Sequence, residues 1–391
     1  MNELTPLMAA SMANAVYSLK ESGNEQQFLR LLSGSPVPKN FDFNLNNHRI
    51  QGVSGSIVSR LLNRKTGFAA IGVGKAAYAG DHVVAIRGTD GLRDLITDLH
   101  IGLAGSENHS LIHAGFSKVF QSIKPGLEKG LTPLLTRSSR GTVHCVGHSL
   151  GGALAHLTAD WVKQRYKNRV CLYTFGSPRV GLDGFAIKTT GSIDKIYRCT
   201  HASDPIPLIP LWPFMHAPYR SSEILLSSSP GLRASGHGMG EKGSPGYINT
   251  ANSHSWDALQ RNSTELFKET ELKYPDRHQV TFTAYWAHRI NNALITLLKK
   301  AGMLPLIYGQ ARIGTYLTFY DLLASSIEKI AKLPGELYRS QVTGLLGHML
   351  VFAGKGGVQV TELSYKFIRW VFGVALAALH RIARQALDFV K

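Results

Sequence analysis

The chain has 391 residues and a mass of 42.8 kDa, of which 44% are hydrophobic and 18% charged. This composition excludes a disordered chain and a small disulfide-stabilised scaffold, and it suffices for one large packed domain with an additional part. Lysine and arginine outnumber aspartate and glutamate by 43 to 26, which gives a net charge of +17. Such a charge favours anionic polymers or anionic lipid surfaces as partners.

Cysteine usage and the N-terminus indicate where the chain is made. The three cysteines, Cys145, Cys171 and Cys199, are odd in number and lie in apolar segments. We therefore expect buried thiols and a reducing compartment. Glu3 stands where a secretory signal carries positive charge, and the best apolar run, 370–379, is too short to span a bilayer. We expect synthesis in the cytoplasm without a cleavable signal.

Hydrophobic periodicity predicts the elements in chain order. Helical spacing of apolar residues predicts helices over 4–19 and 25–32. Short apolar runs bounded by glycine then predict strands over 67–73, 82–86, 142–146, 170–175 and 195–199. Segments such as 151–164, between these runs, have helical character. Alternating strands and helices favour an α/β fold with a mostly parallel sheet covered on both faces.

The composition changes twice after the last predicted strand. Residues 221–255 are rich in Ser, Gly, Pro and Asn, which predicts a long irregular surface loop. Helix-sized apolar blocks follow, and residues 281–391 hold 13 Lys and Arg against 5 Asp and Glu. We therefore predict an α/β domain over 1–275 and a basic, apolar helical C-terminal domain over 276–391.

The segment around Ser149 has the pattern of a nucleophile elbow. The apolar run that begins at Thr142 ends in the G-x-S-x-G sequence 147–151, and helix-forming residues follow. In such a turn the serine hydroxyl is exposed between a strand and a helix, and the glycines leave room for close backbone approach. The free N–H of Leu150 at the helix start is a natural oxyanion donor.

A nucleophilic serine needs a base, and the base needs an orienting acid. In α/β-hydrolases the acid follows a later strand, which favours Asp204 after the run 195–199. Asp160 is expected to face outward on the helix behind the elbow, and Asp183 and Asp194 fall in turns before the strand. An ordinary loop aspartate before a turn proline is the alternative for Asp204.

The histidine of the site is not fixed by the pattern alone. Candidates after the acid are His216, His237, His254, His278 and His288. His254 follows the irregular segment, in a loop from which a side chain can reach the sheet edge and Ser149. The alternative is a solvated loop histidine.

Several blocks in the same order resemble the class 3 lipases, the α/β-hydrolase family that includes fungal triacylglycerol lipases. The blocks are Ile86-Arg87-Gly88-Thr89, Asp94-Leu95-Ile96-Thr97-Asp98-Leu99, His113-Ala114-Gly115-Phe116, Gly147-His148-Ser149-Leu150-Gly151-Gly152-Ala153, Phe175-Gly176-Ser177-Pro178-Arg179-Val180-Gly181 and Ser203-Asp204-Pro205-Ile206-Pro207. They span about half of the chain, residues 60–260. The resemblance implies Ser149 as nucleophile and Asp204 as acid. It also implies His254, fifty residues after the acid, as the base, whereas His216 matches a family histidine that is not the base.

The same resemblance implies an oxyanion hole formed by Thr89 and Leu150, and a lid after Thr89. The apolar residues of this lid lie on one stripe of a short helix: Leu92, Leu95, Ile96 and Leu99. We expect this stripe to cover the site in water and to open against lipid. A plain amphipathic helix fixed against the core is the alternative.

The C-terminal segment lies outside the resemblance. Apolar residues between Phe367 and Leu387 form a broad face bordered by Lys366, Arg369, Arg381 and Arg384, as in helices that lie in a headgroup region. The alternatives are an extra helical domain packed on the hydrolase, and a face that binds a partner or delivery protein.

Other motifs carry no function. The G-x-G-x-x-G sequence 238–243 lacks a strand before it and a helix after it, and neither H-E-x-x-H nor paired C-x-x-C occurs. We expect no metal, no cofactor and no nucleic acid partner.

These features together predict a serine hydrolase that cleaves acyl esters of lipids at a membrane surface, a phospholipase A or a lipase acting through an acyl-enzyme. The alternative is a catalytically inactive lipid-binding or interaction protein on a hydrolase scaffold. Basic charge favours phospholipid over neutral fat. A missing export signal fits a bacterial effector that leaves the cell by a signal-independent route, with a delivery or inhibitor protein as a further partner.

Overall fold

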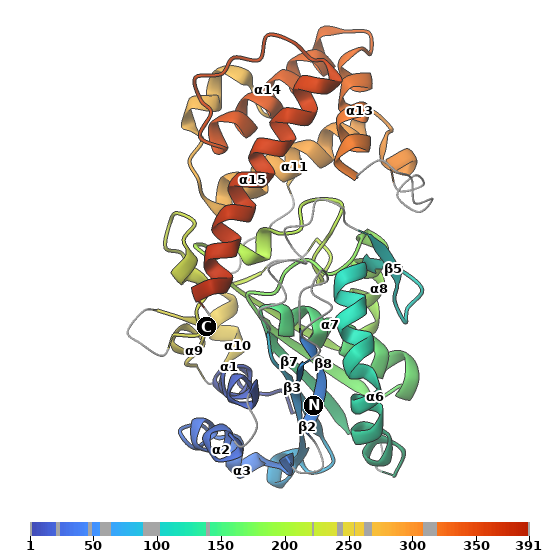
Figure 1. Ribbon diagram of the computed structural model, residues 1–391, viewed down its shortest axis with the longest axis vertical. Coiled ribbons are helices and arrows are strands. Elements are labelled where there is room, and N and C mark those ends of the chain that lie inside the picture. Colours follow the sequence, from blue (N-terminus) through green and yellow to red (C-terminus); the bar gives the residue numbers. More distant parts are fainter. Residues whose placement is uncertain are drawn as a thin grey trace.

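The computed structural model describes most of the chain and shows a sheet layer joined to a helical layer (Figure 1). The described residues are 2–20, 24–45, 49–54, 64–88, 102–137, 141–220, 223–240, 245–253, 255–261, 268–307 and 319–389. Thr89, the lid residues 92–99 and His254 lie outside them.

The central sheet has eight strands among the described residues, in the order β1-β3-β4-β7-β8-β9-β10, with β2 also paired to β3. The strands are β1 (Phe41–Phe43), β2 (Arg49–Ser54), β3 (Arg64–Gly74), β4 (His82–Ile86), β7 (Thr142–His148), β8 (Arg169–Phe175), β9 (Lys195–His201) and β10 (Ile224–Ser227). From β4 to β10 all neighbours are parallel, whereas β1, β2 and β4 run antiparallel to β3. The predicted α/β fold with a mostly parallel sheet is confirmed. A separate antiparallel pair joins β5 (Leu103–Gly105) to β6 (Leu111–His113).

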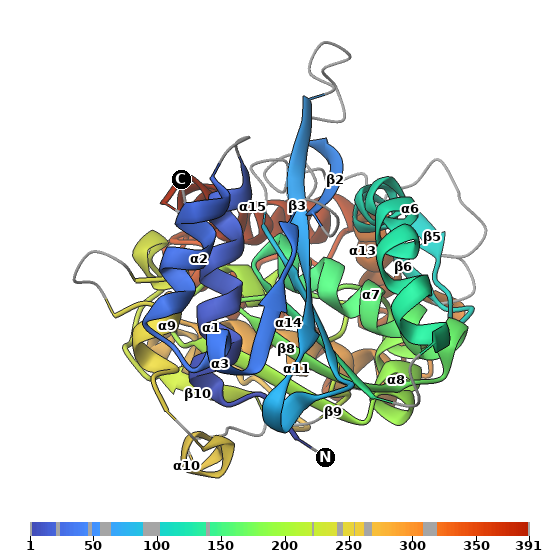
Figure 2. The same cartoon turned by 90° about the horizontal axis from the view of Figure 1, so that it is seen from below.

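Helices cover both faces of this sheet, as Figure 2 shows with α1 and α2 on one side and α6 and α7 on the other. The first group is α1 (Pro6–Ala15), η1 (Val16–Lys20), α2 (Glu25–Ser33) and α3 (Val37–Asn40), and the second is α6 (Ala114–Arg137), α7 (Leu150–Tyr166) and α8 (Asp183–Ser192). Alternate residues of β4 enter different cores: Val83 packs with the N-terminal helices, and Val84 packs with α6 and α7. Burial on both faces explains the continuous apolar strands.

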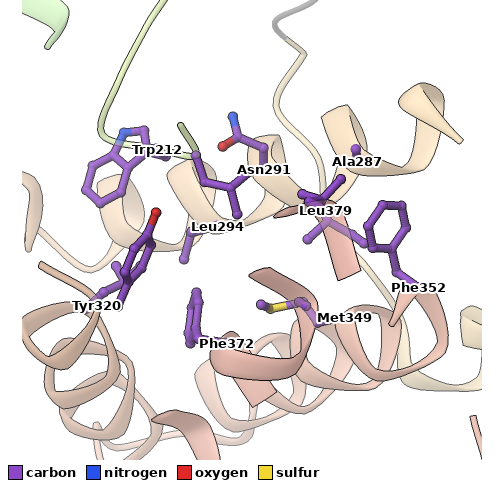
Figure 3. Close-up of a pocket in the computed structure, with 13 residues that line it drawn as sticks. Trp212, Ala287, Asn291, Leu294, Tyr320, Met349, Phe352, Phe372 and Leu379 are labelled. Carbon is purple, nitrogen blue, oxygen red and sulfur yellow. The ribbon is translucent and has the colours of Figure 1, made fainter. Parts of the chain in front are cut away.

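The C-terminal helices pack on the hydrolase-like part through its 205–214 segment. They are α11 (Ala284–Lys300), α13 (Phe319–Ala331), α14 (Glu336–Phe352) and α15 (Tyr365–Phe389). Leu211 and Trp212 reach among these helices, where they line a cavity of about 30 Å³ with Tyr320, Met349 and Phe372 (Figure 3). This volume holds one or two waters and excludes an acyl chain, so the cavity is a packing gap.

The apolar face of α15 is largely covered. Val371, Leu376 and Leu379 are buried, although Trp370 remains 42% exposed. These buried residues belong to the same core cluster as Ile206, Leu208 and Trp212. The predicted boundary near 275 falls within η5 (Tyr274–Gln279), a segment that α14 covers.

Segment 221–255 is more ordered than its composition suggests. It holds the parallel strand β10 together with η4 (Ala234–His237) and α9 (Tyr247–Thr250), and the short helix α10 (Trp256–Gln260) follows it. The short apolar run that begins at Ile224 pairs with β9. The serines on both sides of this run make it resemble a loop in the sequence. The prediction of an irregular loop throughout was therefore wrong.

The expectation of buried thiols is matched. The three cysteines are free and buried, and burial raises the pKa of the Cys171 thiol to about 12. Among the described residues, no helix is long and apolar enough to cross a membrane.

Candidate active site

Ser149 lies at the turn between β7 and α7. Its backbone has φ 57° and ψ −131°, a left-handed conformation that costs free energy for a residue with a side chain. The glycines on either side are required by contact: a Cβ at Gly147 would lie 2.1 Å from the carbonyl oxygen of Gly151, and a Cβ at Gly151 would lie 2.2 Å from that of Ile86. The predicted elbow therefore has the expected geometry.

The imidazole that lies between Ser149 and Asp204 belongs to His237. Its Nε2 is 2.8 Å from Ser149 Oγ, and its Nδ1 is 2.8 Å from Asp204 Oδ2. All three side chains are at most 3% exposed. Because an ionised carboxylate only accepts hydrogen bonds, Nδ1–H donates to Asp204, and Nε2 accepts from the serine hydroxyl when the imidazole is neutral.

This geometry corrects the prediction for the base. His254 was preferred because of its spacing from the acid, but the position between the hydroxyl and the carboxylate is filled by His237, one of the candidates that the pattern left open. Gly236, just before His237, packs tightly on the backbone of Ser203, where a Cβ would lie 2.7 Å from the carbonyl oxygen. The glycines that flank this histidine were the one local signal for close approach.

The remaining candidates are placed elsewhere or not described. His216 donates to the carbonyl oxygen of Pro207, and burial near Arg198 and Arg179 holds its pKa well below the usual range. Thr89 lies outside the described residues, but its neighbour Gly88 lies beside Ser149, since a Cβ there would be 3.2 Å from Ser149 Cβ. Leu150 is buried and begins α7, where helical N–H groups have no helical acceptor.

Asp204 is held by two donors besides His237. The Tyr247 hydroxyl donates to Oδ2 at 2.6 Å, and the backbone N–H of Ile206 donates to Oδ1 at 2.8 Å. Burial, and then the Asp204 charge, raise the pKa of Tyr247 well above its usual value, so the phenol keeps its proton. Gly176 makes room for this group: its φ is +55°, and a Cβ would lie 2.5 Å from Asp204 Oδ2. No sequence motif indicated a role for Tyr247.

A second histidine, His148, packs against His237. The ring of His148 stacks on that of His237 with a centroid separation of 4.6 Å, and its Nε2 is 2.9 Å from the His237 carbonyl oxygen. Burial lowers the pKa of His148 well below its usual value, so this imidazole is neutral. Nε2–H therefore donates to the carbonyl, and Nδ1 accepts from the Tyr17 hydroxyl at 2.7 Å.

Helix α7 contains a buried acid, Asp160, whose environment was predicted wrongly from the sequence. Asp160 was expected to face outward, but it is fully buried and accepts from the backbone N–H of Asn108 at 3.1 Å. Burial raises its pKa to about 6. It lies away from the three residues above because it faces the β5–β6 turn.

The arrangement suits proton transfer from a hydroxyl to an imidazole. Among residues that the structure describes, no group of three or more His, Cys, Asp or Glu side chains is placed to hold a metal ion. The positive end of α7 points toward the serine, where negative charge on a bound oxygen would be stabilised.

Comparison with known proteins shows which family the region around Ser149 and Asp204 resembles. Residues 83–214 match the family model for lipase (class 3). Secreted mono- and diacylglycerol lipase 1 of Fusarium solani is 31% identical over 163 residues, which cover 40% of this chain and 47% of that protein. Toxin TseL of Vibrio cholerae is 33% identical over 141 residues, which cover 35% of this chain and 21% of that protein. The chain thus spans less than half the length of these two relatives.

Among solved structures, the lipase of Rhizopus microsporus var. chinensis aligns with a TM-score of 0.41 and 22% identity, over 58% of this chain and 73% of that one. The family match contains the elbow and extends past Asp204, the two residues that contact His237. Residues 83–214 of this chain belong to the class 3 lipase family.

Proposed function

We propose that this chain is a serine hydrolase that cleaves acyl ester bonds of lipids, with Ser149 as nucleophile, His237 as general base and Asp204 as orienting acid. The observation that carries the proposal is the continuous hydrogen-bond chain from Asp204 through His237 to Ser149. A hydroxyl is a weak nucleophile until a base removes its proton, and this chain supplies such a base.

In the proposed reaction His237 Nε2 takes the proton of Ser149 as Oγ bonds to the ester carbonyl carbon. The N–H of Leu150, together with Thr89, stabilises the resulting oxyanion, and one such donor contributes about 2.7–4 kcal/mol in a related enzyme. The imidazolium then gives its proton to the departing alcohol as the ester C–O bond breaks. Water hydrolyses the acyl-enzyme by the same steps in reverse order, which returns the hydroxyl to Ser149.

The proposed substrate is a lipid ester at a membrane surface, with phospholipid preferred. The net charge of +17 attracts anionic headgroups. Several large apolar side chains of the helical part are at least 42% exposed: Tyr285, Leu306, Leu337 and Trp370. Apolar side chains on a basic protein favour adsorption to an anionic bilayer. The name of the Fusarium relative, a mono- and diacylglycerol lipase, supports the lipid ester class.

A fluorophosphonate probe tests the chemistry, because it reacts only with an activated serine. We expect labelling of the native protein and none of Ser149→Ala, with vesicles of phosphatidylglycerol present to allow any lid to open. A native protein that stays unlabelled under these conditions favours the alternative of an inactive lipid-binding protein. Release of fatty acid from phospholipids and triacylglycerols of defined acyl position then identifies the substrate.

Adsorption is tested separately by sedimentation with vesicles. We expect binding to phosphatidylglycerol that weakens as salt rises above about 0.1 M, and little binding to phosphatidylcholine. Equal binding to both lipids would remove the electrostatic part of the proposal while leaving the chemistry intact.

We further infer that the protein acts as a bacterial toxin against a target membrane, exported by a signal-independent route and paired with an inhibitor or delivery protein. The similarity to Toxin TseL supports this role. Expression of the chain in the periplasm of a susceptible bacterium should stop growth and change the phospholipid composition, whereas Ser149→Ala should do neither. Unchanged growth and lipids with the native chain would overturn the toxin role.

A further inference from the structure

The base-bearing segment η4 is a single turn whose position is set by what packs on it. A short 3₁₀ turn has weak internal hydrogen bonding, so its own backbone cannot hold His237 in place. On the side of the sheet, His148 Nε2 is 2.9 Å from the carbonyl oxygen of His237, and His201 Nδ1 is 2.9 Å from that of Gly236. These two imidazoles fix one side of η4.

The end of α15 covers another side of η4. The helix packs directly on η4, and the Phe389 ring lies against the residue after the base, since a Cβ at Gly238 would be 3.1 Å from Phe389 Cε1. Ala234, the first residue of η4, packs on the core cluster that includes Leu387. Figure 1 shows α15 running from the helical layer toward the sheet layer.

The same helix also reaches the segment that follows the acid. The short turn η3 (Ile206–Leu208) begins two residues after Asp204 and contacts α15 and α11. Its first residue, Ile206, donates its backbone N–H to Asp204 Oδ1 and is fully buried in the cluster that contains Leu387. One helix, more than 150 residues after the acid in the chain, therefore contacts the supports of both the acid and the base.

We propose that the last turns of α15, through Leu387 and Phe389, position His237 against Ser149 and Asp204. The helical part is then a component of the active-site scaffold, and this inference rests on the proposed function. Leu387 and Phe389 touch none of the three side chains that react, so they are positioning residues. A displacement of about 1 Å at a reacting group can cost about 10²-fold in rate.

Point variants of the full-length chain test this role. The double variant Leu387→Ala/Phe389→Ala removes two apolar side chains of the last turn, one buried and one beside Gly238, and Gln385→Ala in the same turn is the control because its side chain is exposed. Hydrolysis of a soluble short-chain p-nitrophenyl ester keeps adsorption out of the measurement. We expect kcat of the double variant to fall about 10- to 100-fold with KM nearly unchanged, and Gln385→Ala to match the native protein.

Conservative replacement separates positioning from general stability. Leu387→Met/Phe389→Leu keeps apolar bulk at both sites and should restore kcat to within about threefold of the native value. If the double alanine variant does not fold, Phe389→Ala alone serves, because this side chain is 51% exposed and its loss spares the core. A folded double alanine variant, or failing that a folded Phe389→Ala, with native kcat overturns the inference.

A second pair of variants tests the contact itself. Gly238→Val places bulk where Phe389 lies, and Gly238 has φ −68°, so the backbone tolerates a side chain. We expect Gly238→Val to lower kcat about tenfold, and the combination with Phe389→Ala to be no worse than either single change, because the two act through one contact. Strictly additive losses would contradict the role of this contact.

Failure of the inference is distinguishable from failure of the proposed function. Fluorophosphonate labelling of the native chain and of Ser149→Ala reports the function alone. If the native chain is labelled at Ser149 and the Leu387 and Phe389 variants are labelled at the same rate, only the positioning role is wrong. If the native chain is not labelled, the proposed function fails first.

Discussion

Ser149 and His237, the proposed nucleophile and the proposed base, are held in different ways. Ser149 is fixed by its immediate neighbours, because β7, two glycines and α7 leave one conformation for the turn. His237 is fixed by residues far away in the chain: His148 and His201 on the sheet, and Phe389 on the last helix. The site therefore has a local half, the Ser149 turn, whose geometry follows from neighbouring residues in the sequence. It also has a non-local half, around His237, which forms only when distant segments pack together.

The largest change in activity is expected when the two candidate bases, His237 and His254, are each replaced by alanine. We expect His237→Ala to lower kcat by about 10⁴-fold or more, since loss of the base leaves the hydroxyl protonated. His254→Ala should stay within a few-fold of the native protein, as should the control His278→Ala, whose side chain is exposed. Ester hydrolysis and fluorophosphonate labelling measure both; the reverse order would restore His254 as the base.

Substitution of a glycine beside Ser149 tests whether the neighbouring residues fix the turn. Gly147→Ala places a Cβ 2.1 Å from the Gly151 carbonyl oxygen, a backbone atom that cannot move away without disturbing the elbow. We expect a loss of about 3 kcal/mol or more in the free energy of unfolding. Gly34→Ala is the matched control, because its Cβ would meet nothing within 4 Å. Urea unfolding compares the two, and similar losses would show that the elbow is looser than its geometry indicates.

The non-local half is tested at the acid. Tyr247→Phe removes the hydroxyl that donates to Asp204 Oδ2 at 2.6 Å, and a hydrogen bond to a charged acceptor contributes about 1.5–3 kcal/mol. We expect kcat to fall about 10- to 100-fold, with a smaller change in KM. Tyr285→Phe serves as the control because Tyr285 is 61% exposed. A native kcat in Tyr247→Phe would show that Asp204 needs no third donor.

The same division explains what the sequence predicted. The strands β3, β4, β7, β8 and β9, the elbow and the acid each leave a local signature: a run of apolar residues, G-x-S-x-G, or an aspartate after a strand. Tyr247 leaves none, and His237 leaves only the glycines on either side of it, because their roles depend on contacts across the fold. Both lie in a segment whose serines and glycines suggest a loop. Spacing from the acid selected His254, although spacing along a loop does not determine which side chain returns to the sheet.

His237 follows β10 in the chain and its turn η4 packs against α15, and neither the strand nor this contact is visible as a motif. β10 was hidden in a serine-rich stretch, and the helical tail lay outside every family block. The elbow helix itself was predicted correctly, but the environment of Asp160 on it was not, since that environment is supplied by Asn108. Even the local half of the site therefore has non-local surroundings.

The smallest expected effect concerns this acid. Burial raises the pKa of Asp160 to about 6, so the native state binds a proton more tightly than the unfolded state does. Stability therefore falls as pH rises from the unfolded value near 4 to about 6, and the penalty stays constant above that range. Asp160→Asn removes the ionisable group and keeps an oxygen for the N–H of Asn108. We expect a gain of at most about 2–3 kcal/mol in the free energy of unfolding at pH 7 and almost none at pH 4.

Asp42→Asn, at an exposed ion pair with Lys75, is the control and should change stability by less than about 1 kcal/mol at either pH. Urea unfolding at both pH values measures the difference, and a gain that does not depend on pH would show that folding leaves the pKa of Asp160 unchanged.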